Sequence, residues 1–295
     1  LAQMADAHKL FPLFHEVAYK FPEYSEKSYY QKYTTYSMYL IAQQSQKTDA
    51  FLQLYRKFLE KGIQPIVMKG IVCRQLYGQY AEYRLSKDED ILVKQDEFFA
   101  VKDIMENQGF VCTQPDVTEA QLEKLQEVAF YEEKTGFLIE VHMNIMGHDN
   151  DMYTKMGEPF EDVFENIQIQ EICGVPVAIM NHTKNFIFLV LHALKHFALS
   201  GIGMRQMLDI GLYQETFESD IDWVQVKQIL EECSALGFLG DLQSISTRYL
   251  GVVLKNKFQS VKPDVLLQDI IADGVFGQHA SADEVAMSIT LSTAG

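Results

Sequence analysis

The sequence predicts an α+β fold, with a helical N-terminal segment, a small mixed sheet with flanking helices, and a helical C-terminal region. Three observations lead to this prediction. Apolar residues recur at helical spacing through residues 1–62, short apolar strand-like runs follow in the middle of the chain, and helical periodicity returns from Asn181 onward. We therefore divide the chain into a helical segment, 1–62, a mixed-sheet domain, 63–180, and a helical C-terminal region, 181–295.

The individual elements follow from local patterns. Tyr29, Tyr33, Tyr36 and Leu40 form a stripe typical of a packing helix. Strands are expected at 64–68, 90–93, 109–112, 128–134 and 137–145, with a helix over 96–108 and a hairpin turn at Thr135-Gly136. A β-like piece covers 167–180, and helices are expected at 186–198, 205–217, 223–236, 239–250 and 265–272. The single tryptophan, Trp223, is expected to pack among these helices.

The composition is that of a globular protein with a substantial core. Of 295 residues, 47% are hydrophobic and 22% are charged. The formal net charge is −16, from 41 acidic against 25 basic side chains. A broad nucleic-acid surface needs many basic contacts to phosphate, so this charge argues against one but permits a small basic pocket.

The cysteines and the apolar runs favour a cytoplasmic protein without a membrane anchor. The four cysteines are widely spaced and form no C-x-x-C pair, which excludes the usual zinc and disulfide patterns. The longest dense apolar run, 186–191, is too short to span a bilayer. The first residues lack a basic stretch followed by an apolar one, so we expect no signal peptide.

Two aspartates open one of the predicted strands. Side chains alternate between the two faces of a strand, so Asp88 and Asp90 point the same way and Glu89 points the other way. Two neighbouring carboxylates repel each other unless a cation lies between them. Hard divalent cations prefer such oxygen ligands, and Mg²⁺ typically combines one or two carboxylates with substrate phosphates.

Glu140 is a third candidate carboxylate. It interrupts the apolar run 137–141, and a buried acid there is costly unless it is paired or metal-bound. If its strand lies beside that of Asp88 and Asp90, three carboxylates converge and can hold two metal ions. His142 lies on the same face as Glu140, where it either orients that carboxylate or is a hydrogen-bonded sheet histidine.

The order of these motifs resembles the polymerase-β-like nucleotidyltransferases. The motifs are Lys69-Gly70, then Arg84-x-Ser86-x-Asp88-x-Asp90, then Ile139-Glu140-Val141-His142. Within that superfamily the chain is most similar to a largely uncharacterised bacterial family, over roughly residues 50–215. The resemblance implies a nucleotidyltransferase-type fold, a nucleoside triphosphate as substrate, and Mg²⁺ or Mn²⁺ as cofactor. It assigns the metal ligands and catalytic groups to Asp88, Asp90 and Glu140, and the nucleotide contacts to Lys69, Gly70, Arg84 and Ser86.

The sequence departs from the superfamily pattern at two positions. Gly70 is followed by Ile71, where the fold usually has a second glycine or a serine, so a hydroxyl that can touch phosphate is missing. The residue between the two aspartates is Glu89, where the pattern is usually apolar. If Glu89 lies deep in the sheet, it needs a cationic partner such as Lys87 or Arg84.

We therefore expect an enzyme that transfers a nucleotidyl group from a nucleoside triphosphate to an unknown hydroxyl acceptor. The acidic charge favours a small molecule or a protein over nucleic acid as acceptor. One alternative is a non-catalytic nucleotide- or partner-binding protein on the same fold. Another is a toxin-like transferase acting on transfer RNA, because the Arg-x-Ser-x-Asp-x-Asp run also resembles abortive-infection toxins. His192 and His196 have zinc-site spacing but lack the accompanying glutamate, so packing is expected for them.

Overall fold

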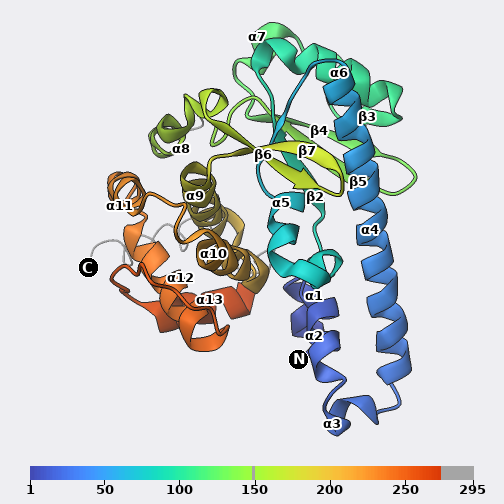
Figure 1. The fold of residues 1–295 in the computed structure, drawn as a ribbon, viewed down its shortest axis with the longest axis vertical. Helices are drawn as coiled ribbons and strands as arrows, with labels where there is room; N and C mark the ends of the chain where they lie inside the picture. The colour runs from blue at the N-terminus through green and yellow to red at the C-terminus, as the bar shows by residue number, and fades with distance from the viewer. Residues whose placement is uncertain (148–149, 274–295) are drawn as a thin grey trace. The chain divides into compact units, whose positions relative to one another are not determined.

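The computed structural model describes residues 1–147 and 150–273, which group into two compact units. The sheet unit contains 44–75 and 86–185, and the helical unit contains 1–43, 76–85 and the residues from 186 onward. Figure 1 labels the helices and strands of both units. The division into 1–62, 63–180 and 181–295 stays a prediction, and the end of the last region, beyond 273, lies outside the described residues.

Among the described residues, seven strands form one mixed sheet, in the spatial order β3-β4-β5-β2-β1-β7-β6. The pairs β2/β5 and β1/β7 are parallel, and the other neighbours are antiparallel. This confirms the expected mixed sheet. The strands are β1 Ile66–Val67, β2 Asp88–Leu92, β3 Phe110–Cys112, β4 Glu127–Glu132, β5 Phe137–His142, β6 Ile167–Ile172 and β7 Val175–Met180. The longer helices of this unit are the end of α4 Tyr30–Glu60, α6 Phe98–Asn107 and α8 Asp151–Gly157, and the short α5 Ile71–Arg74 follows β1.

One face of the sheet packs against α4 and α6. Phe58 of α4 and Val101 of α6 belong to one buried core with Ile91 of β2 and Val141 of β5. Because side chains alternate along a strand, the even-numbered residues of β2 and β5 point to the opposite face. The sheet therefore has an apolar helix-covered face and a second face on which its acidic residues gather.

Tyr55 holds the short strand β1 in place. Its hydroxyl donates to the Pro65 carbonyl at 2.7 Å and accepts from the Ala178 amide at 2.9 Å. Burial raises the pKa of Tyr55 to about 12. Strand β1 has only two residues, so these side-chain bonds supplement its backbone ladder and help to fix the turn that carries Lys69.

The helical unit begins with short helices rather than one continuous one. Pro12 and Pro22 lie in the first turns of α2 and α3, where a proline ring suits a helix start and the absent amide is not missed. The Trp223 ring lies 5.3 Å from that of Phe186, which confirms its predicted packing role. The helices are α1 Ala2–Ala7, α2 Phe11–Ala18, α3 Pro22–Ser25, the start of α4, η1 Gln75–Tyr83, most of α9 His182–Ser200, α10 Met204–Phe217, α11 Trp223–Glu232, α12 Leu236–Tyr249 and α13 Pro263–Asp273.

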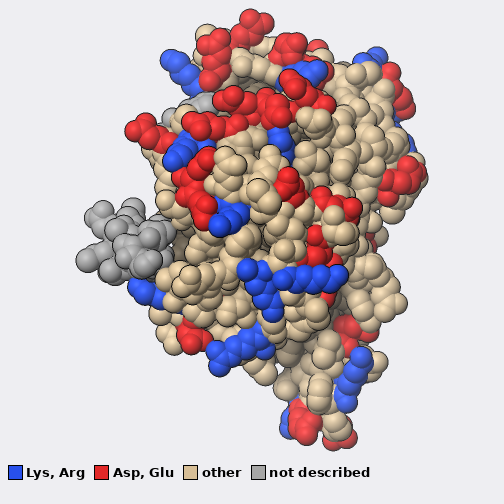
Figure 2. Space-filling view, turned by 60° about the vertical axis from the view of Figure 1, so that its left-hand side comes forward, with Lys and Arg blue, Asp and Glu red and all other residues tan. Residues whose placement is uncertain are grey.

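The charged side chains on the surface and the hydropathy of the helices agree with what the composition predicts. Acidic and basic side chains are interspersed on the face drawn in Figure 2, and no broad, purely basic area covers the described residues seen there. Within the described part of the chain, no helix combines the length and the hydropathy needed to cross a bilayer.

Candidate metal centre

Strands β2 and β5 lie side by side and bring the three predicted carboxylates to one face. In their parallel register, Asp90 is paired with Glu140, and Asp88 with Leu138. Directly paired residues of neighbouring strands share a face, and so do residues two apart on one strand. Asp88, Asp90, Glu140 and His142 therefore lie on the same side of the sheet, opposite the helix-covered core.

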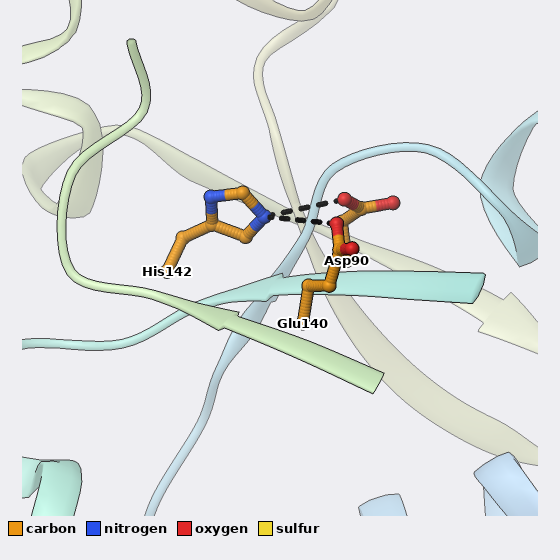
Figure 3. Close-up of side chains that lie close together, drawn as sticks. All are labelled: Asp90, Glu140 and His142. Atoms are coloured by element: carbon orange, nitrogen blue, oxygen red, sulfur yellow. Dashed lines mark hydrogen bonds and ion pairs between the residues drawn. The ribbon is translucent and has the colours of Figure 1, made fainter. Parts of the chain in front are cut away.

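Asp90 is the most enclosed of these carboxylates, with an exposed fraction of 1%. The Lys69 ammonium lies 3.1 Å from Asp90 Oδ1. His142 Nε2 lies 3.2 Å from the same oxygen (Figure 3). Lys69 reaches this position because it follows β1, the strand paired to β2 on the side away from β5. A buried carboxylate is thus held between one lysine and one histidine from two different neighbouring strands.

Glu140 carries the clearest electrostatic signature of the centre. Burial, followed by the charges of Asp90, Glu127 and Asp88, raises its pKa to about 9 against the opposing effect of Lys69. Without a further positive charge, the centre favours the protonated form of Glu140 at neutral pH.

The same acids also raise the pKa of Lys69, which favours its charged form. Burial lowers its pKa, but the nearby charges of Asp90, Asp88 and Glu140 together outweigh that effect and raise the pKa above the usual lysine value. Lys69 is therefore a cation at neutral pH. Asp88, Asp90 and Glu140 together carry more negative charge than Lys69 offsets, and such an excess of acids favours the binding of a cation.

His142 links the centre to an acid that the sequence analysis missed. Its Nδ1 lies 3.2 Å from Glu127 Oε2, and its Nε2 lies 3.9 Å from Glu140 Oε2. Glu127 opens β4 and is paired with His142 in the antiparallel register of β4 and β5. The only sequence signal for it was an acid at the start of a strand, which does not indicate which strand lies next to it.

The donor set fits a divalent cation. Asp90, Glu140 and His142 each offer one ligand atom, and these three atoms lie within 4.8 Å of one another (Figure 3). Two carboxylates and an imidazole are ordinary ligands for divalent ions. Asp88 is near enough to affect the pKa values of Lys69 and Glu140, so its charge belongs to the same centre.

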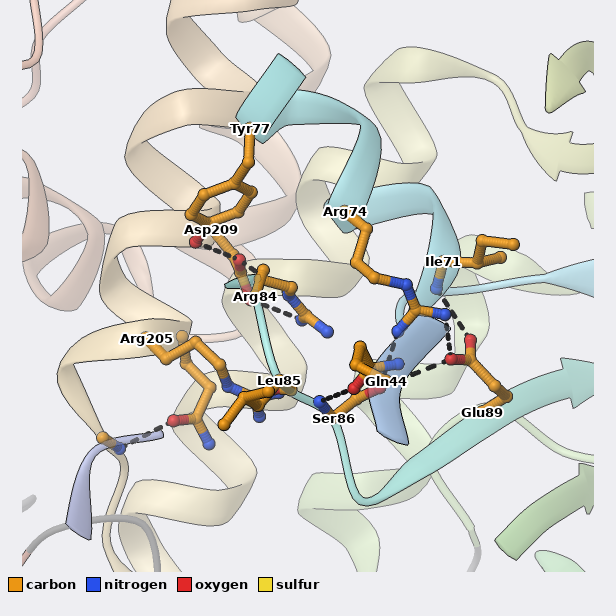
Figure 4. A network of polar contacts seen from close by, with 12 residues as sticks. Gln44, Ile71, Arg74, Tyr77, Arg84, Leu85, Ser86, Glu89, Arg205 and Asp209 are labelled. Atoms are coloured by element: carbon orange, nitrogen blue, oxygen red, sulfur yellow. Dashed lines mark hydrogen bonds and ion pairs between the residues drawn. The ribbon is translucent and has the colours of Figure 1, made fainter. Parts of the chain in front are cut away.

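The opposite face of β2 carries a separate, fully buried charge pair. Glu89 is 0% exposed and forms an ion pair with Arg74 of α5, which is also 0% exposed (Figure 4). Arg74 also donates to Ser86 Oγ at 2.6 Å. The sequence analysis expected a cationic partner for a buried Glu89 but pointed to Lys87 or Arg84. Arg74 was missed because it lies 15 residues away on a helix whose direction the sequence did not fix.

Glu89 also explains the glycine of the Lys69-Gly70 motif. Gly70 has φ 54°, and a Cβ there would overlap the Glu89 carboxylate. The next amide, that of Ile71, donates to Glu89 Oε2 at 2.7 Å. The turn after β1 therefore binds an acidic side chain of its own protein, and phosphate contact by Gly70 stays a prediction.

The two other predicted nucleotide contacts also have protein partners. Ser86 donates its backbone amide to Gln44 Oε1 at 2.8 Å, besides accepting from Arg74. In the helical unit, Arg84 donates from Nε and Nη2 to the two oxygens of Asp209, at 3.1 and 2.6 Å (Figure 4). Arg84 is 3% exposed, so it is not a surface cation.

Tyr77 completes the Arg84–Asp209 group. Its hydroxyl donates to Asp209 Oδ1 at 2.8 Å. Burial and the Asp209 charge raise the Tyr77 pKa well above that of an ordinary tyrosine. Asp209 thus receives two charge-assisted bonds from Arg84 and one from a phenol, which is a stable way to bury its charge.

A cavity of about 260 Å³ lies next to the carboxylate face. Leu92, two residues beyond Asp90 on β2, lines it together with Met143 and Asn144, which follow His142. Its remaining walls come from α8 and the two short turns after it, including Phe160 and Phe164. A small group bound at the acids could extend into it past Leu92.

Comparison with known proteins assigns the family. A family model described as uncharacterised nucleotidyltransferase matches residues 1–251. Searches of curated proteins and of solved structures give no match. The matched region contains every motif residue discussed above and extends beyond the roughly 50–215 over which the resemblance was noted. Nucleotidyltransferases generally use a nucleoside triphosphate and a divalent metal ion, which fits the acid and histidine group on β2 and β5. The chain belongs to this family of nucleotidyltransferases.

Proposed function

We propose that the protein transfers a nucleotidyl group from a nucleoside triphosphate to a hydroxyl group, with Asp88, Asp90 and Glu140 as its metal-binding and catalytic carboxylates. One observation carries the proposal. Asp90, Glu140 and His142 bring one ligand atom each to within 4.8 Å of one another, on a face that also carries Asp88, so a positive charge is favoured there. A divalent cation with bound triphosphate supplies that charge where the family's chemistry needs it.

Mg²⁺ or Mn²⁺ bound there would polarise the phosphates, activate the attacking hydroxyl and stabilise the leaving pyrophosphate. The protein's own part is to hold Asp88, Asp90 and Glu140 on one rigid strand pair, so that little reorganisation is needed as charge develops. Lys69 adds a fixed positive charge beside Asp90.

The proposed reaction balances as a single displacement. The acceptor oxygen attacks the α-phosphorus, the bond from the α-phosphorus to the bridging oxygen breaks, and pyrophosphate leaves. The acceptor proton passes to a base. Glu140 either takes that proton or ligates the metal ion, and both roles require its ionised form.

Lys69 is the strongest of the four proposed nucleotide contacts. Its ammonium lies beside the acids that would hold the metal, where triphosphate oxygens would also be. Arg84 and Ser86 would have to exchange or share bonds that they make within the protein, and the amide next to Gly70, that of Ile71, already donates to Glu89. We retain them as proposed contacts and rank them below Lys69.

The cavity beside Leu92 is our proposed place for the acceptor or the nucleoside. The acceptor that we propose is a small molecule or a protein, because the chain is strongly acidic. The four cysteines are free thiols, which fits the reducing cytoplasm that we propose as its location.

Binding and transfer test the proposal in sequence. Calorimetric titration of each of the four nucleoside triphosphates with Mg²⁺ or Mn²⁺ should reveal metal-dependent binding. An α-³²P-labelled nucleotide should then label an acceptor in a fractionated small-molecule or protein pool and release pyrophosphate. Absence of metal-dependent binding for every nucleotide would overturn the proposal.

The alternative of a non-catalytic binding protein has one specific observation in its favour. The Ile71 amide, close to the predicted phosphate-side turn, is occupied by Glu89, and the second glycine or serine is missing. This alternative predicts nucleotide binding without pyrophosphate release from any acceptor pool. A transfer-RNA substrate is a further alternative that the same labelled assay tests, although the interspersed charges of Figure 2 do not favour it.

A further inference from the structure

The orientation of His142 suggests a role beyond that of a sheet residue. Its ring is 2% exposed and lies between two acidic sites. Nδ1 faces Glu127 at 3.2 Å, and Nε2 faces Asp90 at 3.2 Å and Glu140 at 3.9 Å (Figure 3). The ring thus points one nitrogen toward β4 and the other into the carboxylate centre.

The position of Glu127 determines which ring nitrogen of His142 is available to a ligand. The Glu127 carboxylate lies 3.2 Å from Nδ1 and its negative charge favours a proton on that nitrogen, which leaves the Nε2 lone pair to face Asp90 and Glu140 when a cation binds there. A lone pair facing two carboxylates is repulsive unless a proton or a cation lies between them. Metal-binding histidines typically have this arrangement, with one ring nitrogen on the metal and the other bonded to a carboxylate.

We propose that His142 Nε2 is a direct ligand of the divalent cation, that Glu127 is its positioning residue, and that the centre therefore prefers a first-row transition ion to Mg²⁺. This inference rests on the proposed function, because it concerns the same cation. Asp90, Glu140 and His142 supply two oxygens and one nitrogen within 4.8 Å of one another. Imidazole suits transition ions, whereas Mg²⁺ is bound mainly by carboxylates, phosphates and water.

Electron spin-echo spectroscopy of the whole protein with Mn²⁺ alone tests the inference without relying on activity. Bound Mn²⁺ should show modulation from a directly coordinated ¹⁴N nucleus. Growth with [¹⁵N]histidine should replace that modulation by the ¹⁵N pattern, which requires no substitution. His142→Gln should remove it and weaken Mn²⁺ binding by roughly 10- to 100-fold, while changing Mg²⁺ binding by less than about threefold.

Two further variants separate a ligand from a merely structural residue. Glu127→Gln should keep the ¹⁴N modulation but weaken Mn²⁺ binding by roughly tenfold, because the amide orients the ring less strongly than the carboxylate. His196→Gln is the matched control. His196 belongs to the helical unit, where its ring lies 4.3 Å from that of His192, and its loss should leave the modulation unchanged.

The outcomes distinguish this inference from the proposed function. The parent protein could bind Mn²⁺ without histidine modulation, and Asp90→Asn could abolish that binding. This result would overturn the role of His142 but support the metal centre. Equal affinities for Mn²⁺ and Mg²⁺ in the parent protein would overturn the proposed preference. No binding of either ion, with or without nucleotide, would overturn the proposed function together with the inference.

Discussion

On one face of strand β2, the Glu89 carboxylate is matched by Arg74, and the pair is completely buried. On the other face, Asp88, Asp90 and Glu140 lie near Lys69 and His142, and burial among these acids raises the Glu140 pKa to about 9. Burial is similar for Glu89 and Asp90, so burial alone does not separate a structural acid from a site acid. The balance of charge does, because a neutralised pair needs nothing further and an acid excess attracts a cation.

The largest expected effect is on the acid-rich face. Asp90→Asn removes one charge and almost no volume, so we expect metal-dependent transfer to fall by at least about a thousandfold with the fold intact. Labelled-nucleotide transfer and thermal unfolding measure the two effects. Asp96→Asn, an exposed acid shortly after the same strand, should change neither. If Asp90→Asn transferred nucleotide at the parent rate, the proposal that this face is catalytic would be wrong.

Substitutions in the Glu89–Arg74 pair should change the free energy of unfolding. Glu89→Leu strands the buried Arg74 guanidinium, so we expect the free energy of unfolding to fall by roughly 4 kcal/mol. The double variant Arg74→Met/Glu89→Leu should recover most of that loss. A small deficit should remain, because the Ile71 amide no longer has the Glu89 carboxylate as its acceptor. Urea denaturation measures both. Equal stability of Glu89→Leu and the parent would show that the pair is not structural.

Glu140→Gln should stabilise the metal-free protein while removing its function. The folded pKa of about 9 exceeds the usual 4.5, so the folded state keeps a proton that the unfolded chain releases. Stability from this group is complete below about 4.5 and is lost as the pH rises toward 9. At pH 7 the neutral glutamine should gain about 3 kcal/mol. Melting curves from pH 5 to 9 with a chelator should diverge as the pH rises, and parallel curves would show that Glu140 is not crowded.

The smallest expected effect concerns Lys69. Lys69→Met removes the cation beside Asp90, so metal ions alone should bind more tightly, by roughly fivefold, or about 1 kcal/mol. Nucleotide binding should weaken if the ammonium also contacts triphosphate. Calorimetry with metal alone and with metal plus nucleotide separates the two contributions. Tighter binding in both titrations would remove Lys69 from the proposed nucleotide contacts.

Local sequence patterns predicted most elements of the fold. The expected strands at 64–68, 90–93 and 109–112 correspond to β1, β2 and β3, and the helices after Asn181 correspond to α9 through α13. The breaks among α1, α2 and α3 were missed, since the apolar spacing of the first 62 residues is helical on both sides of each break. Periodicity reports the type of an element more reliably than its ends.

The sequence by itself determined that Asp88 and Asp90 share a face and that Glu89 faces the other way, because alternation is a property of every strand. Only the tertiary structure decided that β5 lies beside β2, which pairs Asp90 with Glu140, and that Arg74 neutralises Glu89. Strand neighbours and the partners of buried charges depend on long-range packing, which no local pattern records. The acids of the candidate centre were therefore visible in the sequence, whereas the charge balance around them was set by the fold.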